Sequence, residues 1–314
     1  MNILRNFFSR LLLIIISIFI VLVFLEIYVR FYYDNGKVYE LEMLKYADKL
    51  KYQVIKEDKF YFAHHPNKEE KIMGANIKIN KNGFRYNSKN KNKNKNKNKI
   101  LMMGDSMTFG FGSTKTFSSI LNKNLEDFLV INAGVGNTNT VMQVDSFFDK
   151  DYLQNPNVII LNFFINDLEE INYLSKGILH YSYLYNLMSY KFNIIILNSR
   201  NIDYINFYKE TFKKSKNLDK MYESLIKLNR YCQKKNIKFI IHLIPDVRNL
   251  KNNIFDNEFD LIKNFSIKNN INIISGFDYF KNYDNSNFLV TELDPHLNER
   301  GHKLIASYLI KYIK

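Results

Sequence analysis

A serine and its neighbours in this chain have the residue types of an acyl-transfer site. Ser106 stands in Gly104-Asp105-Ser106, directly after the apolar run Ile100–Met103. An apolar run that ends at glycine and aspartate predicts a buried strand followed by a sharp turn. A serine at the carboxyl end of a parallel strand lies where open α/β sheets place their chemistry. All three residue types are also common in turns, so this motif alone leaves a plain turn open.

The far end of the chain holds the groups that a serine nucleophile needs. Asp294-Pro295-His296 precedes an amphipathic helical pattern that runs to the C-terminus. Histidine is the usual general base for a serine, and a carboxylate is the usual group that fixes its tautomer. We therefore predict Ser106 as nucleophile, His296 as base and Asp294 as the orienting acid. The alternative is that Asp294 caps a turn and His296 is a surface histidine.

Four segments resemble, in the correct order, the motif blocks of the SGNH (GDSL-type) hydrolases. The resemblance is to the bacterial subset with an amino-terminal membrane helix. The blocks are Gly104–Gly110, Asn132–Asn137, Phe163–Leu168 and Asp294–Gly301. Two earlier segments, Phe62–Asn67 and Asn80–Arg85, are similar to the stretch that this subset carries before its catalytic domain. The resemblance implies a serine hydrolase that requires no metal and no cofactor.

The same resemblance implies an oxyanion hole. Its donors would be the Ser106 N–H, the Asn166 side chain and one N–H of the second block. Phe164 stands where the family's third block often has glycine, although Asn166 itself is present. The family's usual second-block glycine falls on Asn137. Any residue but proline supplies an N–H, and asparagine enters left-handed conformations readily, so Asn137 is favoured over Gly136.

Strand-like apolar runs recur beyond the nucleophile and alternate with helical patterns. The runs are Phe128–Asn132, Val158–Phe164, Ile237–Ile244 and Ile271–Ile274, and the helical patterns include Thr116–Leu125, Leu218–Lys234 and Phe255–Asn269. Such alternation predicts a parallel sheet covered on both faces. We expect a flavodoxin-like, three-layer α/β/α domain of about five parallel strands over 100–314, which is the SGNH hydrolase fold. Ser106, the second block and Asn166 would then share one edge of the sheet.

Residues 1–33 have the composition of a membrane segment. Arg5 and Arg10 precede the uncharged and largely apolar run Leu11–Leu25. No small-x-small site follows the apolar core, so a retained single-pass anchor is favoured over a cleaved signal peptide. The two arginines favour a cytoplasmic start, which places the catalytic domain on the extracytoplasmic side of the cell membrane.

Two charged residues, Glu26 and Arg30, interrupt the end of this segment. A membrane span takes about 20 residues, a length that is reached only by including them. Because they are four apart on one helical face, we expect them to pair or to snorkel at the membrane boundary.

Two segments separate the anchor from the catalytic domain. Residues 34–88 are interpreted as a small neck, with a helical pattern over Leu41–Tyr52 and short strands over Lys59–Tyr86. Residues 89–99 are a Lys/Asn repeat that holds six lysines of a chain with formal net charge +14. The repeat cannot bury a core, so we expect a solvated loop, with a polybasic patch as the alternative. No aromatic residues are interleaved, so no nucleic-acid partner is expected.

The stretch Glu169–Leu218 carries no family motif but is rich in aromatic residues. They include Tyr173, Tyr181, Tyr183, Tyr185, Tyr190 and Phe192. We expect a helical insertion bordering the site, in which most of these aromatic side chains pack in the core. The single Cys232 excludes an internal disulfide and a cysteine-built zinc site, and its helical setting indicates a buried structural thiol.

The sequence thus predicts a membrane-anchored serine esterase that hydrolyses carboxylic esters through an acyl-enzyme. Resemblance and location favour O-acetyl groups on cell-envelope glycans as substrate, with lysophospholipids or other lipid esters second. Two alternatives stay open. One is an envelope-polysaccharide O-acyltransferase that uses the same triad, and the other is a non-catalytic scaffold that binds polymer. No protein partner is indicated.

Overall fold

The chain folds into two compact units. The computed structural model describes residues 2–57, 59–87, 98–150, 153, 155–171, 177–199, 203–250, 253–283, 287–291 and 295–313. One unit, here called the N-terminal unit, comprises Met1–Leu44 and Leu174–Asn201. The other, here called the α/β unit, comprises Lys45–Tyr173 and Ile202–Lys314.

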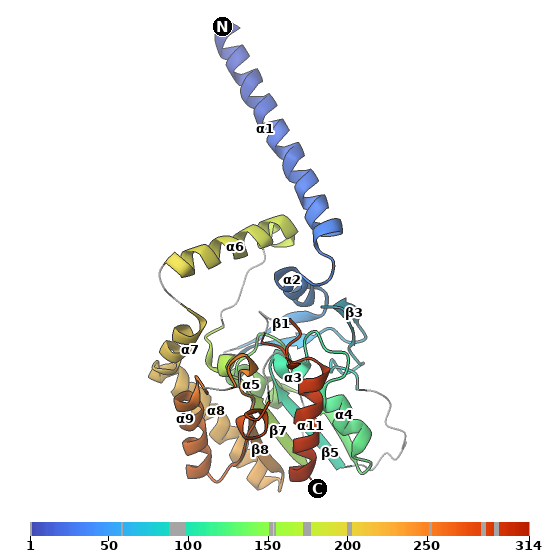
Figure 1. Ribbon diagram of the computed structural model, residues 1–314, viewed down its shortest axis with the longest axis vertical. Helices are drawn as coiled ribbons and strands as arrows, with labels where there is room; N and C mark the ends of the chain where they lie inside the picture. Colours follow the sequence, from blue (N-terminus) through green and yellow to red (C-terminus); the bar gives the residue numbers. More distant parts are fainter. Residues whose placement is uncertain are drawn as a thin grey trace. The chain divides into compact units, whose positions relative to one another are not determined.

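The α/β unit is built on a five-stranded sheet with the order β6-β5-β7-β8-β9 (Figure 1). The strands are β5 (Asn98–Gly104), β6 (Phe128–Asn132), β7 (Val158–Phe163), β8 (Lys238–Leu243) and β9 (Asn272–Ser275). All four neighbouring pairs are parallel. In chain order this is the 2-1-3-4-5 arrangement of flavodoxin-like folds, whose strand order reverses between β5 and β7. The predicted fold class is confirmed.

Helices cover both faces of this sheet. They are α4 (Phe117–Asn124), α5 (Thr140–Asp149), α8 (Ser215–Lys234), α9 (Asp256–Lys268) and α11 (Glu299–Ile313). The crossover through α4 runs in one direction along the sheet, and those through α5, α8 and α9 run in the other. Because such crossovers are right-handed, α4 lies on the opposite face from these three, and α11 packs beside α4. Shorter elements are α3 (Ser106–Phe109), η3 (Ile165–Leu168), α7 (Tyr204–Phe212), η5 (Val247–Asn249) and α10 (Phe277–Phe280).

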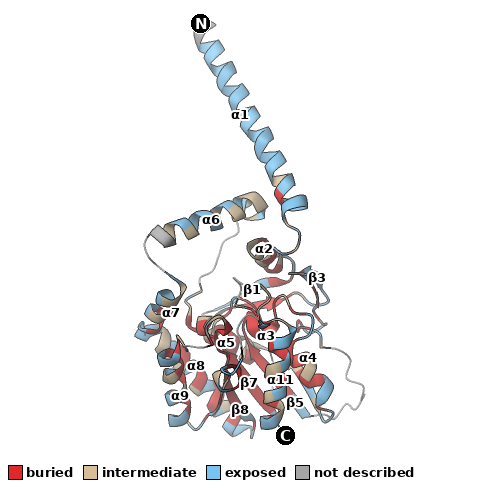
Figure 2. Cartoon of the chain, in the orientation of Figure 1, coloured by how far each residue is buried: buried red, intermediate tan, exposed pale blue. Residues whose placement is uncertain are grey.

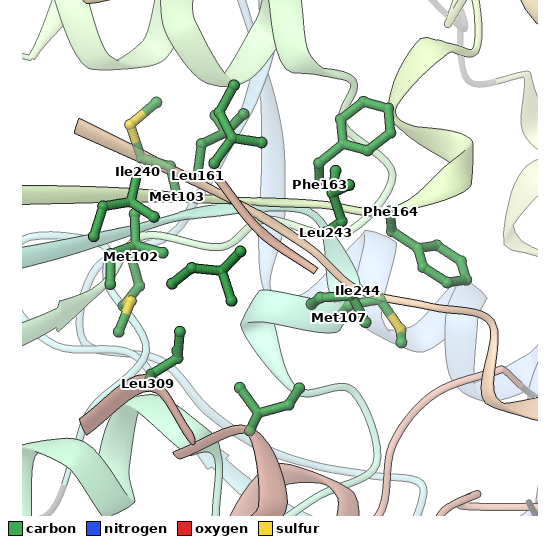
Figure 3. Close-up of a cluster of buried hydrophobic side chains, with 14 of the residues drawn as sticks. Met102, Met103, Met107, Leu161, Phe163, Phe164, Ile240, Leu243, Ile244 and Leu309 are labelled. Atoms are coloured by element: carbon green, nitrogen blue, oxygen red, sulfur yellow. The ribbon is translucent and has the colours of Figure 1, made fainter. Parts of the chain in front are cut away.

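The core fills the space on both sides of the strands (Figures 2 and 3). Every residue of β7 is buried, as expected for a central strand covered on both faces. Met102 and Met103, consecutive in β5, are both buried, because successive strand residues point to opposite faces and both faces are covered. Figure 3 shows Leu309 of α11 in the same cluster. Cys232 is buried as predicted.

From Lys45 onward the predicted neck belongs to the α/β unit. α2 (Tyr39–Lys49) is followed by the hairpin β1 (Lys51–Lys56) and β2 (Lys59–His64), and by the hairpin β3 (Glu69–Ile72) and β4 (Ala75–Lys78). The predicted helix over 41–52 extends too far, because residues 51 and 52 already pair with residues 64 and 63 in the first hairpin. β2 packs against α5.

The Lys/Asn repeat predicted as a loop over 89–99 lies outside the described residues except for its last two. Asn98 and Lys99 are exposed and already belong to β5, where they pair with Phe128 and Leu129 of β6. The sheet therefore begins two residues before the predicted domain boundary at 100.

The N-terminal unit is dominated by one long helix. α1 (Asn2–Tyr28) continues into the π-helical turn η1 (Val29–Tyr33). The stretch Leu4–Tyr33 is long and apolar enough to cross a membrane, and only 6% of its most apolar window is buried. Figure 2 shows this exposure along most of α1. The length of the helix agrees with the predicted segment 1–33.

The second part of this unit is the aromatic insertion. It forms the 3-10 turn η4 (Ile178–Tyr181) and the helix α6 (Tyr183–Ser199), so the prediction of a helical insertion is confirmed. The prediction that its aromatic side chains pack in the core is wrong for four of them. Tyr181, Tyr185, Tyr190 and Phe192 are between 37% and 62% exposed. Tyr173 lies outside the described residues.

Candidate active site

Ser106 is the first residue of α3, a single turn that starts where β5 ends. The Asp105 side chain caps this turn by accepting the Met107 N–H at 2.8 Å. As the first helical residue, Ser106 has an N–H with no acceptor inside the helix. Gly104 has a φ of +150°, and a Cβ there would meet Thr108 Oγ1 at 2.1 Å. Only glycine therefore allows the strand to turn so tightly into the helix that carries the serine.

The second block runs past the end of β6 alongside this turn. Asn132 donates from Nδ2 to the Thr108 carbonyl at 2.9 Å and accepts the Gly134 N–H at 3.1 Å. Gly134 lies so close to α3 that a Cβ would meet Phe109 N at 2.3 Å. Asn137 follows, exposed and in the left-handed region with φ +58°. Asparagine adopts this conformation more readily than most residues.

The Gly136 peptide is bound from both sides by residues of the neck. Its N–H donates to the Tyr46 hydroxyl at 2.7 Å, and its carbonyl accepts from Lys51 Nζ at 3.0 Å. The Tyr46 hydroxyl also lies 2.8 Å from His64 Nε2. Burial raises the pKa of Tyr46 and lowers the pKa of His64 to about 3. Tyr46 therefore stays protonated, donates to a neutral His64 and accepts from Gly136.

Arg85, also from the neck, holds the other end of α3. Its buried guanidinium donates to the carbonyls of Phe109 at 2.8 Å and Gly110 at 2.6 Å, and to that of Ser113. Its centre lies 5.0 Å from the Phe109 ring. Burial lowers the pKa of Arg85 to about 10, so it is a cation at neutral pH. These bonds satisfy carbonyls at the end of α3 that have no intrahelical donor.

The third block follows β7 as the turn η3. Buried Asp167 fixes this turn by accepting the Phe164 N–H at 3.0 Å and Gln143 Nε2 at 2.8 Å. Burial and the neighbouring Asp105 raise the pKa of Asp167 well above its usual range. The adjacent Asn166 side chain hydrogen-bonds the Asp105 carboxyl group. The turn thus presents the Asn166 amide to the residue that precedes Ser106.

Asp105 is the point at which the separate segments meet. Its carboxyl group accepts from the Ser106 hydroxyl at 3.3 Å and from the Asn166 amide, and it attracts His296 electrostatically. Complete burial raises the pKa of Asp105. The His296 ring lies 4.9 Å from the ring of Phe111, whose N–H donates to the Ser106 carbonyl. The structure therefore brings Ser106, Asn166 and His296 around one carboxyl group.

His296 is held in place by a short antiparallel bridge before α11. The Val290 N–H donates to the His296 carbonyl at 2.9 Å. Asn298 Oδ1 accepts the N–H groups of Arg300 and Gly301 and so caps α11. His296 is only 4% exposed, which excludes the alternative of a surface histidine. Asp294 lies outside the described residues, so its place beside His296 stays a prediction.

Two other buried histidines, His242 and His302, are not part of the group formed by Ser106, Asn166 and His296. His242 in β8 lies 2.8 Å from Asn162 Oδ1 and 2.6 Å from the Tyr279 hydroxyl. His302 in α11 has its ring 5.4 Å from Phe117. Burial lowers the pKa of each histidine to about 3, so both are neutral in the folded chain. Both are expected to be structural.

A hollow of about 210 Å³ lies beside the third block. Its polar walls are Asn139, Asp145, Asp167, Glu169, Glu170, Asn217 and Lys220, and its apolar walls include Phe60, Met142 and Met221. The Tyr208 hydroxyl donates to Glu169, and burial raises the pKa of that carboxyl group. Because Asp167 follows Asn166 directly, the hollow adjoins the turn that presents the Asn166 amide.

No family model matches this sequence, and no curated protein matches it. Solved structures are similar to it over about two thirds of the chain. An acetyl xylan esterase, AlAXEase, is 17% identical with a TM-score of 0.44, over 69% of this chain and 100% of that one. A lipolytic protein of the G-D-S-L family from Veillonella parvula is 16% identical, with a TM-score of 0.43 over 68% and 96%. Axe2, an acetylxylan esterase from Geobacillus stearothermophilus, is 14% identical, with a TM-score of 0.45 over 68% and 93%.

Three residues of the neck that contact this site were not identified from the sequence as parts of it. Arg85 lay in a segment noted only for its resemblance, and Tyr46 and Lys51 lay in a pattern interpreted as a neck helix. The resemblance of the segment Asn80–Arg85 to the family's stretch before the catalytic domain was the feature that could have indicated Arg85. Nothing in the spacing of Tyr46 indicates that its hydroxyl contacts a loop 90 residues away.

Proposed function

We propose that the chain is a membrane-anchored serine esterase with Ser106 as nucleophile and His296 as general base. The observation that carries this proposal is the convergence of Ser106, Asn166 and His296 around the Asp105 carboxyl group. The convergence lies at the carboxyl end of β5 and β7, where the strand order reverses, and such switch points are where open α/β sheets bind ligands. Asp294, two residues before His296, is proposed as its orienting carboxylate.

The reaction follows from these roles. His296 takes the proton of the Ser106 hydroxyl while its oxygen attacks the ester carbonyl carbon, giving a tetrahedral oxyanion. The oxyanion collapses, the C–O bond to the alcohol breaks, and His296 returns the proton to the leaving oxygen. Water, deprotonated by His296, then attacks the acyl-enzyme and releases the acid with Ser106 restored. Each oxyanion donor typically contributes about 3 kcal/mol to the transition state.

The second-block donor is assigned to Asn137 and not to Gly136. The Gly136 N–H already donates to Tyr46, so turning it toward an oxyanion would break a buried hydrogen bond. The next N–H along the chain belongs to Asn137, whose left-handed conformation redirects the backbone at this position. The N–H of Ser106, free of the helix ladder, is the second donor.

Asp105 is proposed to orient the third donor, Asn166. A side-chain amide has two N–H groups, and Asp105 accepts one of them. The remaining N–H is then fixed in direction and free for an oxyanion. A preorganised donor of this kind needs no reorientation when charge develops in the transition state.

The apolar helix Leu4–Tyr33 is proposed as a retained anchor with the α/β unit on the extracytoplasmic side. A cleaved signal peptide is disfavoured because Glu26 and Arg30 bond to the segment 181–184. Removing the helix would leave the start of α6 without these partners. The anchor is therefore part of a folded unit.

O-acetylated envelope glycans are the proposed substrates. The hollow beside the third block supports a sugar, because carboxyl, amide and ammonium groups stand in its walls next to apolar side chains. Sugars bind through hydrogen bonds to such groups, whereas an acyl chain prefers apolar walls. Lysophospholipids and other lipid esters remain the competing class that the assay below distinguishes.

The test is hydrolysis of aryl esters of increasing acyl length by the detergent-solubilised chain. We expect acetyl esters to be preferred, and Ser106→Ala to lower kcat by at least about 10⁴-fold, as loss of a triad nucleophile does. Undiminished activity in Ser106→Ala would remove the proposed nucleophile. A preference for long acyl chains would shift the substrate to lipid esters. Acyl-sugar forming faster than free acid, when sugar acceptors are added, would make the protein a transferase.

A further inference from the structure

The N-terminal unit carries a second exposed apolar surface besides α1. On α6, Tyr185, Met188, Phe192 and Ile195 are 46%, 60%, 62% and 64% exposed. Their spacing of three, four and three residues places them on one helical face, here called the α6 stripe. Lys191 is the only charged residue in the sequence of α6. A contiguous apolar stripe of this kind usually marks an interaction surface.

The start of α6 is held by a residue of the membrane helix. Glu26 Oε1 accepts the Tyr183 N–H at 3.0 Å, and Glu26 Oε2 accepts the Leu184 N–H at 2.9 Å and the Ser182 hydroxyl at 2.8 Å. A carboxylate at this position satisfies N–H groups that have no partner inside α6 and complements the helix dipole. The cap thus comes from a residue more than 150 positions earlier in the chain.

Arg30 and α2 add further contacts to the same helix. Arg30 pairs with Glu26 at 2.6 Å, as its spacing predicted, and donates to the Tyr181 carbonyl at 2.8 Å. Its guanidinium lies 4.3 Å from the centre of the Tyr183 ring. Farther along α6, the Tyr190 hydroxyl hydrogen-bonds Glu40 of α2. α6 is therefore fixed to the end of α1 and is not a loosely tethered segment.

We propose that α6 lies in the membrane interface and inserts the α6 stripe into the bilayer that α1 spans. This inference rests on the proposed anchor. The Glu26 and Arg30 contacts place the start of α6 at the end of the apolar helix, and Figure 1 draws α6 crosswise to α1. A helix crosswise to a membrane span runs along the bilayer surface. Figure 2 shows the exposed residues along both helices.

The side chains around this junction fit the lipid headgroup region. Tyrosine rings and basic groups gather in that region, the rings because one end is apolar and the other polar. Tyr28, Tyr32 and Tyr33 at the end of the span and Tyr181 of η4 are all at least 41% exposed. Arg30 and Lys191 supply positive charge for anionic headgroups. The partner is therefore a lipid surface, with a second copy of the chain as the competing occupant.

The chain contains no tryptophan, so a single introduced indole reports on one position without background. We would place it at Phe192 in the stripe, at Phe19 in α1 and at Ile267 in α9, which are 62%, 65% and 67% exposed. Each full-length variant, F192W, F19W and I267W, is reconstituted into phosphatidylcholine vesicles. Acyl-brominated phosphatidylcholine quenches indoles within the bilayer, and iodide quenches those in water.

We expect brominated lipid to remove most of the emission of F19W and F192W, and iodide to quench only I267W. Iodide quenching of F192W would overturn the proposal, and quenching of F19W by lipid in the same series would show that the anchor still stands. F192W protected from both quenchers would mean that a second copy covers the stripe, which also overturns it. If lipid fails to quench F19W, the anchor fails and the proposal with it. Esterase activity that depends on Ser106 is read separately and does not enter these outcomes.

Discussion

The two units of this protein differ in how far they bury aromatic side chains of the same type. In the α/β unit, Phe109, Phe111 and Phe163 have no exposed surface, and they lie in or beside the sheet and α3. In the N-terminal unit, Phe19 and Phe192 are 65% and 62% exposed. Hydrophobic side chains leave water wherever an apolar environment exists. The α/β unit therefore supplies its own apolar environment, and the exposure in the N-terminal unit supports the proposal that this unit finds one in lipid.

The polar groups differ in the same way. In the α/β unit, Asp105, Arg85 and Lys51 are buried, and each bonds to backbone or side chains from distant segments. In the N-terminal unit, Glu26 and Arg30 join two helices at the end of an apolar span. In both places a charge marks the junction of separate segments. Among the described residues, such junctions surround Ser106 only in the α/β unit, which agrees with the proposal that this unit carries catalysis and the N-terminal unit carries membrane attachment.

The largest effect that tests this division is expected for Asn166→Ala. The substitution removes a proposed oxyanion donor, so kcat should fall by about 10²–10³-fold while KM changes little. Asn206→Ala is the matched control, because Asn206 is exposed on α7 and its side chain donates to the exposed Asp203, away from the site. Steady-state kinetics on the acetyl ester measure both. A fall in kcat/KM that comes wholly from KM would mean that Asn166 binds substrate without stabilising the oxyanion.

Tyr46→Phe tests whether the neck positions the second block. It leaves the buried Gly136 N–H without an acceptor, which costs about 1–3 kcal/mol. If the shifted second block loses about 1.4 kcal/mol of transition-state stabilisation, the rate falls by a factor of about ten, so we expect kcat to fall by about tenfold. Tyr61→Phe is the control, because its hydroxyl donates to Asp149 instead of to the second block. The control should lose stability with kcat unchanged, and equal losses of kcat in both variants would reduce Tyr46 to a structural residue.

The pH dependence of the free energy of unfolding tests one buried polar group of the α/β unit, His302. Burial, together with Arg85 and His296, lowers the pKa of His302 to about 3, so the folded chain binds no proton there between about pH 6 and 4. The unfolded chain does bind one below about pH 6.5, so wild-type stability is present above that pH and is lost as pH falls. Relative to His302→Leu, the wild type should lose about 1.4 kcal/mol per pH unit. Urea unfolding of both proteins at several pH values measures the difference in their free energies of unfolding. The buried carboxyl groups are the same in both proteins, so their contribution cancels. Parallel curves for the two proteins would mean that His302 is protonated when folded.

The sequence was sufficient for the strands that are short, continuous apolar runs. The short apolar run Phe128–Asn132 formed a strand with the predicted bounds, and the run predicted over Val158–Phe164 formed a strand that ends one residue earlier, at Phe163. The motif blocks placed Ser106 and Asn166 at one edge because parallel strands share their carboxyl ends. The contacts of Tyr46 and Arg85 could not be predicted this way, because they join segments whose distance depends on the complete fold.

The α6 helix shows a different limit. Its sequence is apolar on nearly every face. Such a pattern predicts that the helix is buried, but it does not distinguish a protein core from a membrane. We expected a protein core, whereas the structure exposes Tyr185 and Phe192. The bonds between Glu26 and the start of α6 connect this helix with α1, the proposed membrane helix. Because one partly exposed carboxylate makes all of these bonds, a single substitution weakens them together, and water can replace part of what is lost.

The smallest effect is therefore expected for Glu26→Gln. The amide keeps one acceptor oxygen but loses the charge that pairs with Arg30 and caps α6, a change of about 0.5–2 kcal/mol. A loss of about 1.4 kcal/mol in the free energy of local opening should accelerate hydrogen exchange in the first turn of α6 by about tenfold, while kcat stays at the wild-type value. Glu210→Gln, which breaks the exposed pair with Lys213 in the α/β unit, should change neither quantity. If Glu26→Gln lowered kcat while leaving exchange in α6 unchanged, the two units would not be separable in function, and catalysis would depend on the membrane helix itself.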